Sequence, residues 1–407
     1  MAALGAIPEG VKSLDMLAVH EHELLPPLHF VTAVWGEEYT KVFVRVTLPC
    51  LLSQGNIPSV PTEVPCVYMI FTTDNGRKII EQSEAYIRLC HYLKVEFHLI
   101  SEPIEHKHIT SSDCYRLATA ETVRAGAAIV YLIPDMIFAD GGIRSIVNLL
   151  RAGKMAILVT ALRAIKETLV PQVIAKYYAD GVITIAPREL VGLAYDHIHS
   201  ITKSHFYDGN SECFLPSVFC WQVGREGFLL HSFHLQPIAL CPRSASVSFA
   251  GTIDDDLIIN SGYSDAEIHI VSDSDEVVWF EISAGNYGVA APKRSGMIVL
   301  AQWLRSNTKP FHRSLFPCAI KVHSDTVTGA EWRKVEARAN LVVSQALRNI
   351  YQYPILLELV DRSQRYVDTD EVFVRQFPLS ILKLPAAWSF ASAYQLLLWC
   401  ARAFRRG

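Results

Sequence analysis

The 407-residue sequence is poor in charge, and it lacks regularly spaced cysteines and long apolar runs. Only 19% of its residues are charged and the net charge is −4, which argues against a disordered chain or one that binds nucleic acid. The nine cysteines form no CxxC pair, so neither a zinc finger nor a disulfide framework is expected. No run reaches the roughly 18 apolar residues that span a bilayer, and no basic-then-apolar leader opens the sequence, so we expect a cytoplasmic protein.

Half of the residues are hydrophobic, which predicts a sizeable core, and the length predicts one large domain with additions or two domains. Short β-rich runs alternate with helix-like stretches, a pattern typical of parallel sheets. We expect strands at 41–48, 67–72, 96–100, 127–133 and 155–160, and helices at 77–93, 113–124, 143–151, 167–180 and 187–197. The prediction is an α/β fold with an open, mostly parallel sheet flanked by helices.

The pattern changes after about residue 214 to further short strands, at 228–235, 245–249, 267–271 and 277–283, followed by helix within 310–351. This predicts a mixed β-rich and helical C-terminal part. The resulting domain division is an N-terminal extension (1–40), an α/β domain (41–240), a β-rich and helical region (241–376) and an apolar, basic C-terminal helix (377–407).

A glycine-containing loop follows the first expected strand and includes Pro49, Gly55 and Asn56. Ligands of open α/β sheets bind beyond the carboxyl ends of strands, so these residues are candidates for holding a nucleotide. The loop has neither GxGxxG nor a P-loop pattern, and a tight connection that needs positive φ explains it equally well. Thr73 and Asp74 follow the second strand, where Asp74 either accepts hydrogen bonds from a base or ribose or caps the next helix.

Two carboxylates, Asp135 and Asp140, follow the strand at 127–133 and lead into Gly141 and Gly142. Anionic oxygens at such a place can hold a hard cation that bridges diphosphate oxygens. Over residues 40–240 the order of strand, loop, helix and acidic strand end resembles the GT-A glycosyltransferases, whose DxD motif holds a divalent ion and a nucleotide diphosphate. The spacing departs from that motif, because Ile137 stands where the second acid belongs. Either the motif is degenerate or the two aspartates are turn and cap residues.

The resemblance implies a nucleotide-diphosphate sugar as donor and Mn²⁺ or Mg²⁺ as cofactor, with Asp135, Asp140 and His234 around the cation. His234 lies near the end of an expected strand, where a late histidine completes the site in that family; a hydrogen-bonded core histidine is the alternative. Arg163 is a candidate for neutralising the diphosphate.

Asp254, Asp255 and Asp256 are adjacent carboxylates that repel one another unless they are exposed or hold a cation. An inverting transferase needs one carboxylate as the base for its acceptor hydroxyl, and this run can supply it. The acceptor, whether a glycan, a lipid-linked molecule or a protein, is open.

Two other functions stay open at the level of the sequence. One is a metal-dependent hydrolase built from His197, His199, His231, His234 and the Asp254–Asp256 run. The other is a binding or assembly protein on a transferase-like scaffold. Its docking surface would be the aromatic C-terminal segment, which ends in arginines and also permits peripheral membrane contact.

Overall fold

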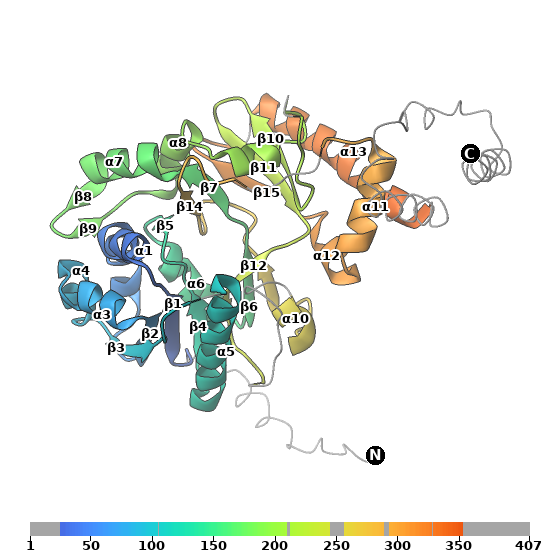
Figure 1. Cartoon of the computed structure of the whole chain (residues 1–407). Helices are drawn as coiled ribbons and strands as arrows, with labels where there is room; N and C mark the ends of the chain where they lie inside the picture. The colour runs from blue at the N-terminus through green and yellow to red at the C-terminus, as the bar shows by residue number, and fades with distance from the viewer. Residues whose placement is uncertain are drawn as a thin grey trace, which may run out of the picture. The chain divides into compact units, whose positions relative to one another are not determined.

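The structure is a computed structural model that describes residues 25–352, except 105, 210–211, 245–255, 289–292 and 328. The chain divides into two units, 1–352 and 353–407, and the described residues all belong to the first. The expected strand at 245–249 and the C-terminal helix at 377–407 therefore lie outside the described residues. Figure 1 shows how the elements are arranged.

A seven-stranded sheet forms the centre of the described fold. Strand β1 pairs in parallel with β2 and β4, β2 with β3, and β6 with β13, whereas β12 runs antiparallel to both of its neighbours. This confirms the predicted open, mostly parallel sheet. Its spatial order is β13 (Ile268–Ile270), β6 (Ala156–Val159), β12 (Gln236–Leu240), β4 (Ala128–Tyr131), β1 (Leu28–Ala33), β2 (Cys66–Thr72) and β3 (Lys94–Leu99).

Within the described residues, three smaller sheets accompany the central one. Two are three-stranded, and the third is a short antiparallel hairpin. They consist of β5 (Met136–Phe138), β14 (Trp279–Ser283) and β7 (Leu162–Ile165); β10 (Val218–Val223), β11 (Gly227–Ser232) and β15 (Ile320–His323); and β8 (Tyr178–Ala179) with β9 (Val182–Ile183).

Helices connect the strands, and most of those expected are present. They are α1 (Glu37–Val42), the π-helix η1 (Phe43–Thr47), α2 (Leu48–Leu51), the 3-10 helix η2 (Ile57–Ser59), α3 (Asp74–Glu81), α4 (Glu84–Leu89), α5 (Lys107–Ala125), α6 (Gly142–Arg151), α7 (Lys166–Tyr177), α8 (Pro187–Tyr195), α9 (Ser200–Ser204), α10 (Asp256–Ser261), α11 (Met297–Asn307), α12 (Pro310–Leu315) and α13 (Ala330–Gln352).

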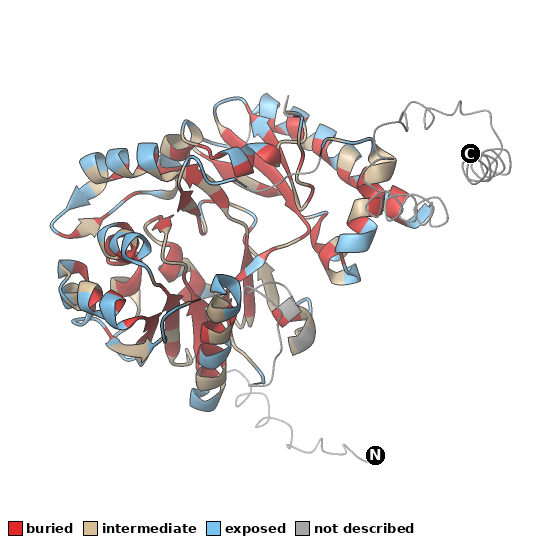
Figure 2. Ribbon diagram, viewed as in Figure 1, coloured by how far each residue is buried: buried red, intermediate tan, exposed pale blue. Residues whose placement is uncertain are grey.

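Helix α6 illustrates how local sequence sets these boundaries. Gly141 precedes it with φ 93°, a conformation that favours glycine, and the helix then buries Ile143, Ile146, Val147 and Leu150. Their spacing of three, one and three residues places them on one face. Figure 2 shows that buried residues follow the strands of the central sheet and the inward faces of its helices. Among the described residues, no helix has the length and apolar character that crossing a bilayer requires.

The prediction of a strand at 41–48 is wrong, because the chain is helical from Glu37 to Leu51. Its β-branched residues favour a strand locally, yet the buried positions Thr40, Phe43 and Thr47 recur at helical intervals. The first strand is instead β1, within the segment read as an extension. Likewise, the helix expected at 77–93 is two short helices, α3 and α4.

Candidate active site

The site lies where the connections of the central sheet change direction. The chain runs from β1 outward through β2 to β3, and then returns to place β4 on the other side of β1. In open α/β sheets a crevice forms at such a switch point, beyond the carboxyl ends of the strands. Trp35 and Gly36 follow β1, and Asp135 follows β4. The fold therefore brings Asp135 to the place where ligands of such sheets bind.

The backbone around Asp135 is held from two sides. The Thr47 hydroxyl donates to the Pro134 carbonyl at 2.7 Å and accepts from the Met136 N–H at 3.2 Å. On the other side, the Ile282 N–H of β14 donates to the Asp135 carbonyl at 2.9 Å. Because the peptide groups on both sides of Asp135 are hydrogen-bonded, its backbone is fixed. The Asp135 side chain therefore leaves the backbone in a defined direction.

Asp135 belongs to a cluster with Glu281 and Arg163. In the β5-β14-β7 sheet Glu281 pairs with Met136 on one side and with Arg163 on the other. The Arg163 guanidinium lies 2.8 Å from Glu281 Oε1 and 3.3 Å from Ser283 Oγ. Glu281 and Arg163 keep only 19% and 30% of their side-chain surface exposed. We call Asp135, Glu281 and Arg163 the carboxyl–arginine cluster.

Burial raises the pKa of both carboxyls in this cluster. It raises the pKa of Asp135 to about 6, against the opposing effect of Arg163 and, more weakly, Lys166. For Glu281, burial and the Asp135 charge raise the pKa to about 7, again opposed by Arg163. When both acids are ionised, a single arginine leaves the cluster with a net negative charge. Such pairs of shifted carboxyls are typical of sites for acid–base chemistry.

Two exposed tyrosines border the cluster. Tyr39 on α1 is 52% exposed, and its pKa is raised by partial burial and then by the charge of Asp135. Tyr287 is 46% exposed, and the Arg163 guanidinium lies 5.6 Å from its ring centre. Aromatic faces that remain open to solvent beside buried charge can pack against the ring of a ligand.

An open depression adjoins these residues. It measures about 430 Å³ and is lined by Ile165, Glu167, Gly285 and Asn286. The register places Ile165 beside Ser283, two pairs along from Arg163 and Glu281, so the depression and the cluster lie on neighbouring stretches of β7 and β14. The Glu167 carboxylate accepts from the Gly285 N–H at 2.9 Å and so shapes this rim. The volume is within the range of small-molecule sites.

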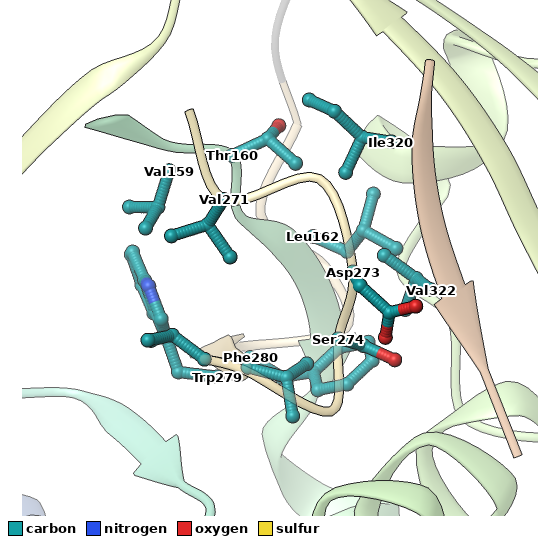
Figure 3. A pocket seen from close by; sticks show the side chains of 12 residues that line it. Val159, Thr160, Leu162, Val271, Asp273, Ser274, Trp279, Phe280, Ile320 and Val322 are labelled. Atoms are coloured by element: carbon teal, nitrogen blue, oxygen red, sulfur yellow. The ribbon is translucent and has the colours of Figure 1, made fainter. Parts of the chain in front are cut away.

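A second cavity is too small for a ligand of this kind. It measures about 20 Å³, room for roughly one water molecule. Figure 3 shows its mainly apolar walls, including Val159, Leu162, Val271, Trp279 and Phe280, with Asp273 and Ser274 at its side. We therefore assign it to packing between β6, β7, β14 and β15.

The residues predicted from the 48–58 loop have structural roles. Pro49 is buried in α2. The Gly55 N–H donates to Asp140 Oδ1 at 2.6 Å. Asn56 is buried, and its amide nitrogen donates to the Cys50 and Ala139 carbonyls while its amide oxygen accepts from the Ile143 N–H. These bonds join the loop to the start of α6 and occupy both ends of the Asn56 amide.

At the end of β2, Thr73 is the residue that caps α3, because its hydroxyl accepts from the Gly76 N–H at 3.2 Å. Asp74 lies in the first turn of that helix, where a negative charge stabilises the helix dipole. The helix thus begins before Arg77, and the cap interpretation applies to Thr73 and not to Asp74.

The predicted cation ligands are not brought together as a set. Asp140 is bonded to Gly55, and its backbone N–H donates to the Ile185 carbonyl. His234 lies beyond the end of β11, with its ring centre 4.4 Å from that of His312. Within the described part of the chain, no group of three side chains at ligand spacing contains Asp135, Asp140 or His234. Because the donors around Asp135 do not match the predicted set, we derive no step through a metal there.

The other predicted catalytic residues lie elsewhere. Asp254 and Asp255 are outside the described residues, and Asp256 begins α10, with no side-chain position described. The hydrolase alternative also finds no assembled histidines in the described ranges, since no group at ligand spacing contains His197, His199 or His231. His199 bonds to the Ala284 carbonyl and His231 to the Phe316 carbonyl, as core histidines do.

Two other groups do have ligand spacing. One consists of Asp273, Asp275 and His323, in which His323 Nε2 lies 2.8 Å from Asp273 Oδ1. Arg188 makes three hydrogen bonds to Asp275, and the Asp325 carbonyl lies 2.5 Å from His323 Nδ1, so this group is a linked ion-pair network. The other group consists of Glu96, His98 and Glu121.

The comparisons with known proteins assign no family to this chain. No protein-family profile and no curated protein matches this chain. Three solved structures with some likeness are a protein from Bacillus anthracis assigned as a glucose-1-phosphate thymidylyltransferase in complex with sucrose (12% identity, TM-score 0.21), mouse xyloside xylosyltransferase 1 (10%, 0.23) and a mannosyltransferase from Pyrobaculum calidifontis in complex with GDP-mannose and Mn²⁺ (11%, 0.29).

The matches cover 34%, 37% and 94% of this chain and 55%, 58% and 82% of the respective proteins. The chain thus spans little more than half the length of the first two. At these TM-scores we draw neither a family nor a function from the likeness.

Proposed function

We propose that this chain is a glycosyltransferase that uses a nucleotide-diphosphate sugar, with the carboxyl–arginine cluster as its reaction centre. The observation that carries the proposal is the pair of carboxyls, Asp135 and Glu281, with pKa values raised to about 6 and about 7 beside Arg163. The pair lies at the switch point of a parallel sheet and next to an open depression.

Glu281 is suited to act as the base for the acceptor hydroxyl. With a pKa of about 7 it is partly ionised at neutral pH, so it can accept a proton and is basic enough to assist the attack. The attacking oxygen then bonds to the sugar carbon as the bond from that carbon to the diphosphate breaks. This role replaces the one predicted for the Asp254–Asp256 run, and it places part of the centre in the 241–376 region, which we propose as the acceptor side.

Arg163 and Lys166 supply positive charge for the leaving diphosphate. Arg163 lies in the cluster, and Lys166 is close enough to lower the pKa of Asp135. A guanidinium binds phosphate oxygens in a bidentate manner and stabilises the charge that develops on them. Asp135 would then orient the hydroxyls of the donor through hydrogen bonds.

The test is ligand-induced stabilisation of the full chain. Nucleoside diphosphates with uracil or guanine, each with and without Mn²⁺, should raise the melting temperature, and Arg163→Gln should reduce that shift. Glu281→Gln should keep the shift and lower the turnover of a nucleotide sugar by about 100-fold or more. Failure of every nucleotide to stabilise the protein would count against the proposal. A melting-temperature shift that requires Mn²⁺ would indicate that the predicted cation binds together with the nucleotide.

A further inference from the structure

We propose that Glu96, His98 and Glu121 form a binding site for a divalent transition-metal ion such as Zn²⁺, distinct from the proposed transfer site. Glu96 and His98 lie two residues apart on the edge strand β3, so their side chains point to the same face of the sheet. Glu121 comes from α5. One ligand atom from each residue lies within 4.8 Å of the other two.

A buried nitrogen without a hydrogen-bond partner favours ion binding at this group. His98 Nε2 is enclosed and has no hydrogen-bond partner among the described residues. It lies 3.7 Å from Glu121 Oε2, which is too long for a hydrogen bond. Two ligands bound to one Zn²⁺ at about 2.0–2.2 Å are separated by roughly 3.5 Å, so the spacing suits a shared ion. A buried polar atom without a partner otherwise costs free energy.

The ring of His98 is also held in position. It stacks on Phe71 with 4.5 Å between ring centres and 16° between planes. An imidazole with little freedom loses little entropy when it binds an ion, and this favours a preformed site.

The charges around the group favour a cation. Two carboxylates face one imidazole, and the ammonium group of Lys94 lies 2.6 Å from Glu96 Oε1. The Lys94 side chain is 71% exposed, so it can turn into water when an ion binds. Nitrogen together with carboxylate oxygen is a donor set typical of zinc and its neighbours, whereas magnesium and calcium prefer oxygen alone.

His29 borders the group without belonging to the three residues at ligand spacing. The Thr122 hydroxyl donates to the Ala118 carbonyl, so at 3.0 Å it accepts from His29 Nδ1–H. This tautomer leaves a lone pair on His29 Nε2, as in metal-bound histidines whose other nitrogen donates a hydrogen bond. Burial lowers the pKa of His29, while Glu96 and Glu121 act in the opposite direction, which shows that both carboxylates are near the ring.

The experiment is calorimetric titration of chelator-treated full-length protein with ZnCl₂, without nucleotide. The wild type should bind one ion, Glu121→Gln and His98→Gln should each bind it at least 10-fold more weakly, and MgCl₂ should not compete. Asp273→Asn is the matched control, because it alters the other group at ligand spacing and should bind zinc like the wild type. Circular dichroism checks that each variant is folded, and if His98→Gln does not fold, the isosteric Glu121→Gln decides.

Absence of zinc binding by the wild type would overturn the proposal. So would binding that survives in Glu121→Gln, which would indicate a cysteine or surface site, or binding that is lost in Asp273→Asn. Arg163→Gln separates this proposal from the transferase: it should reduce stabilisation by nucleotide and leave the zinc affinity unchanged.

Discussion

At the scale of single residues, the raised pKa values of Asp135 and Glu281 make stability depend on pH. In the unfolded chain these acids ionise near 3.8 and 4.5, whereas in the folded chain they keep their protons up to about 6 and about 7. The folded state therefore binds more protons between these values, and the free energy of unfolding falls as pH rises from about 4 to about 7.

Glu281→Gln should remove part of this decline, on the order of 2 kcal/mol between pH 4.5 and pH 7.5. The amide cannot ionise and can still accept a hydrogen bond from Arg163. Urea denaturation at several pH values measures the effect. Parallel stability profiles for wild type and variant would show that Glu281 ionises normally in the folded protein.

Thr47 is a positioning residue for Asp135. Thr47→Val leaves the Pro134 carbonyl and the Met136 N–H without their partner, which should cost about 1–3 kcal/mol. Because the peptide groups on both sides of Asp135 lose an anchor, stabilisation by nucleotide diphosphate should also weaken.

Thr308→Val is the control for Thr47→Val, since it makes the same change at a buried hydroxyl that accepts from Arg313 Nε at 3.0 Å. It should lower the melting temperature and leave the response to nucleotide intact. Equal losses of the response in both variants would assign Thr47 to general stability alone.

Only half of the site could be found from the sequence. Asp135 was predicted because it closely follows an expected strand, and in the structure it lies four residues after the end of β4. Glu281 and Tyr39 carried no such signal: Glu281 lies inside a strand 146 positions further along, and Tyr39 lies in the segment read as an N-terminal extension. Tertiary pairing of β14 with β5 and β7 brings them together, and no local pattern encodes it.

At the scale of elements, the contact between the α2–η2 turn and the start of α6 depends on the absence of a side chain at Gly55. A Cβ there would come within 2.5 Å of the Gly141 nitrogen and 2.7 Å of Asp140 Oδ1. Gly55→Ala should therefore destabilise the protein by about 1–3 kcal/mol, as other overpacked positions do. Gly296→Ala meets no atom within 4 Å and should change the urea midpoint little. Tolerance of alanine at both positions would show that the α6 start can move.

Strands with apolar, β-branched runs were predicted from the sequence, whereas β1 and β12 were not. Strand β1 follows directly on Pro26-Pro27, a stop signal. Strand β12 contains Pro237, a residue that argues against a central strand. The sheet accommodates Pro237 through a shift in the register of β12 against β6 between Pro237 and Ala239.

At the scale of the whole described unit, β12 has a consequence for how the chain can fold. It lies between β4 and β6, which both precede it in sequence by 70 residues or more. Until residues 236–240 arrive, β4 and β6 present bare edges, and such edges pair with other chains.

A chain ended after Leu235 should therefore aggregate, although it holds five of the seven strands of the central sheet. Light scattering measures this aggregation, with the 25–352 fragment as the reference. A monomeric, cooperatively unfolding 25–235 fragment would show that the sheet closes without β12.

During synthesis, the sheet thus stays divided until more than half of the protein has left the ribosome. A chaperone that shields strand edges would be most needed in that interval, and slow translation just before residue 236 would lengthen the period of risk.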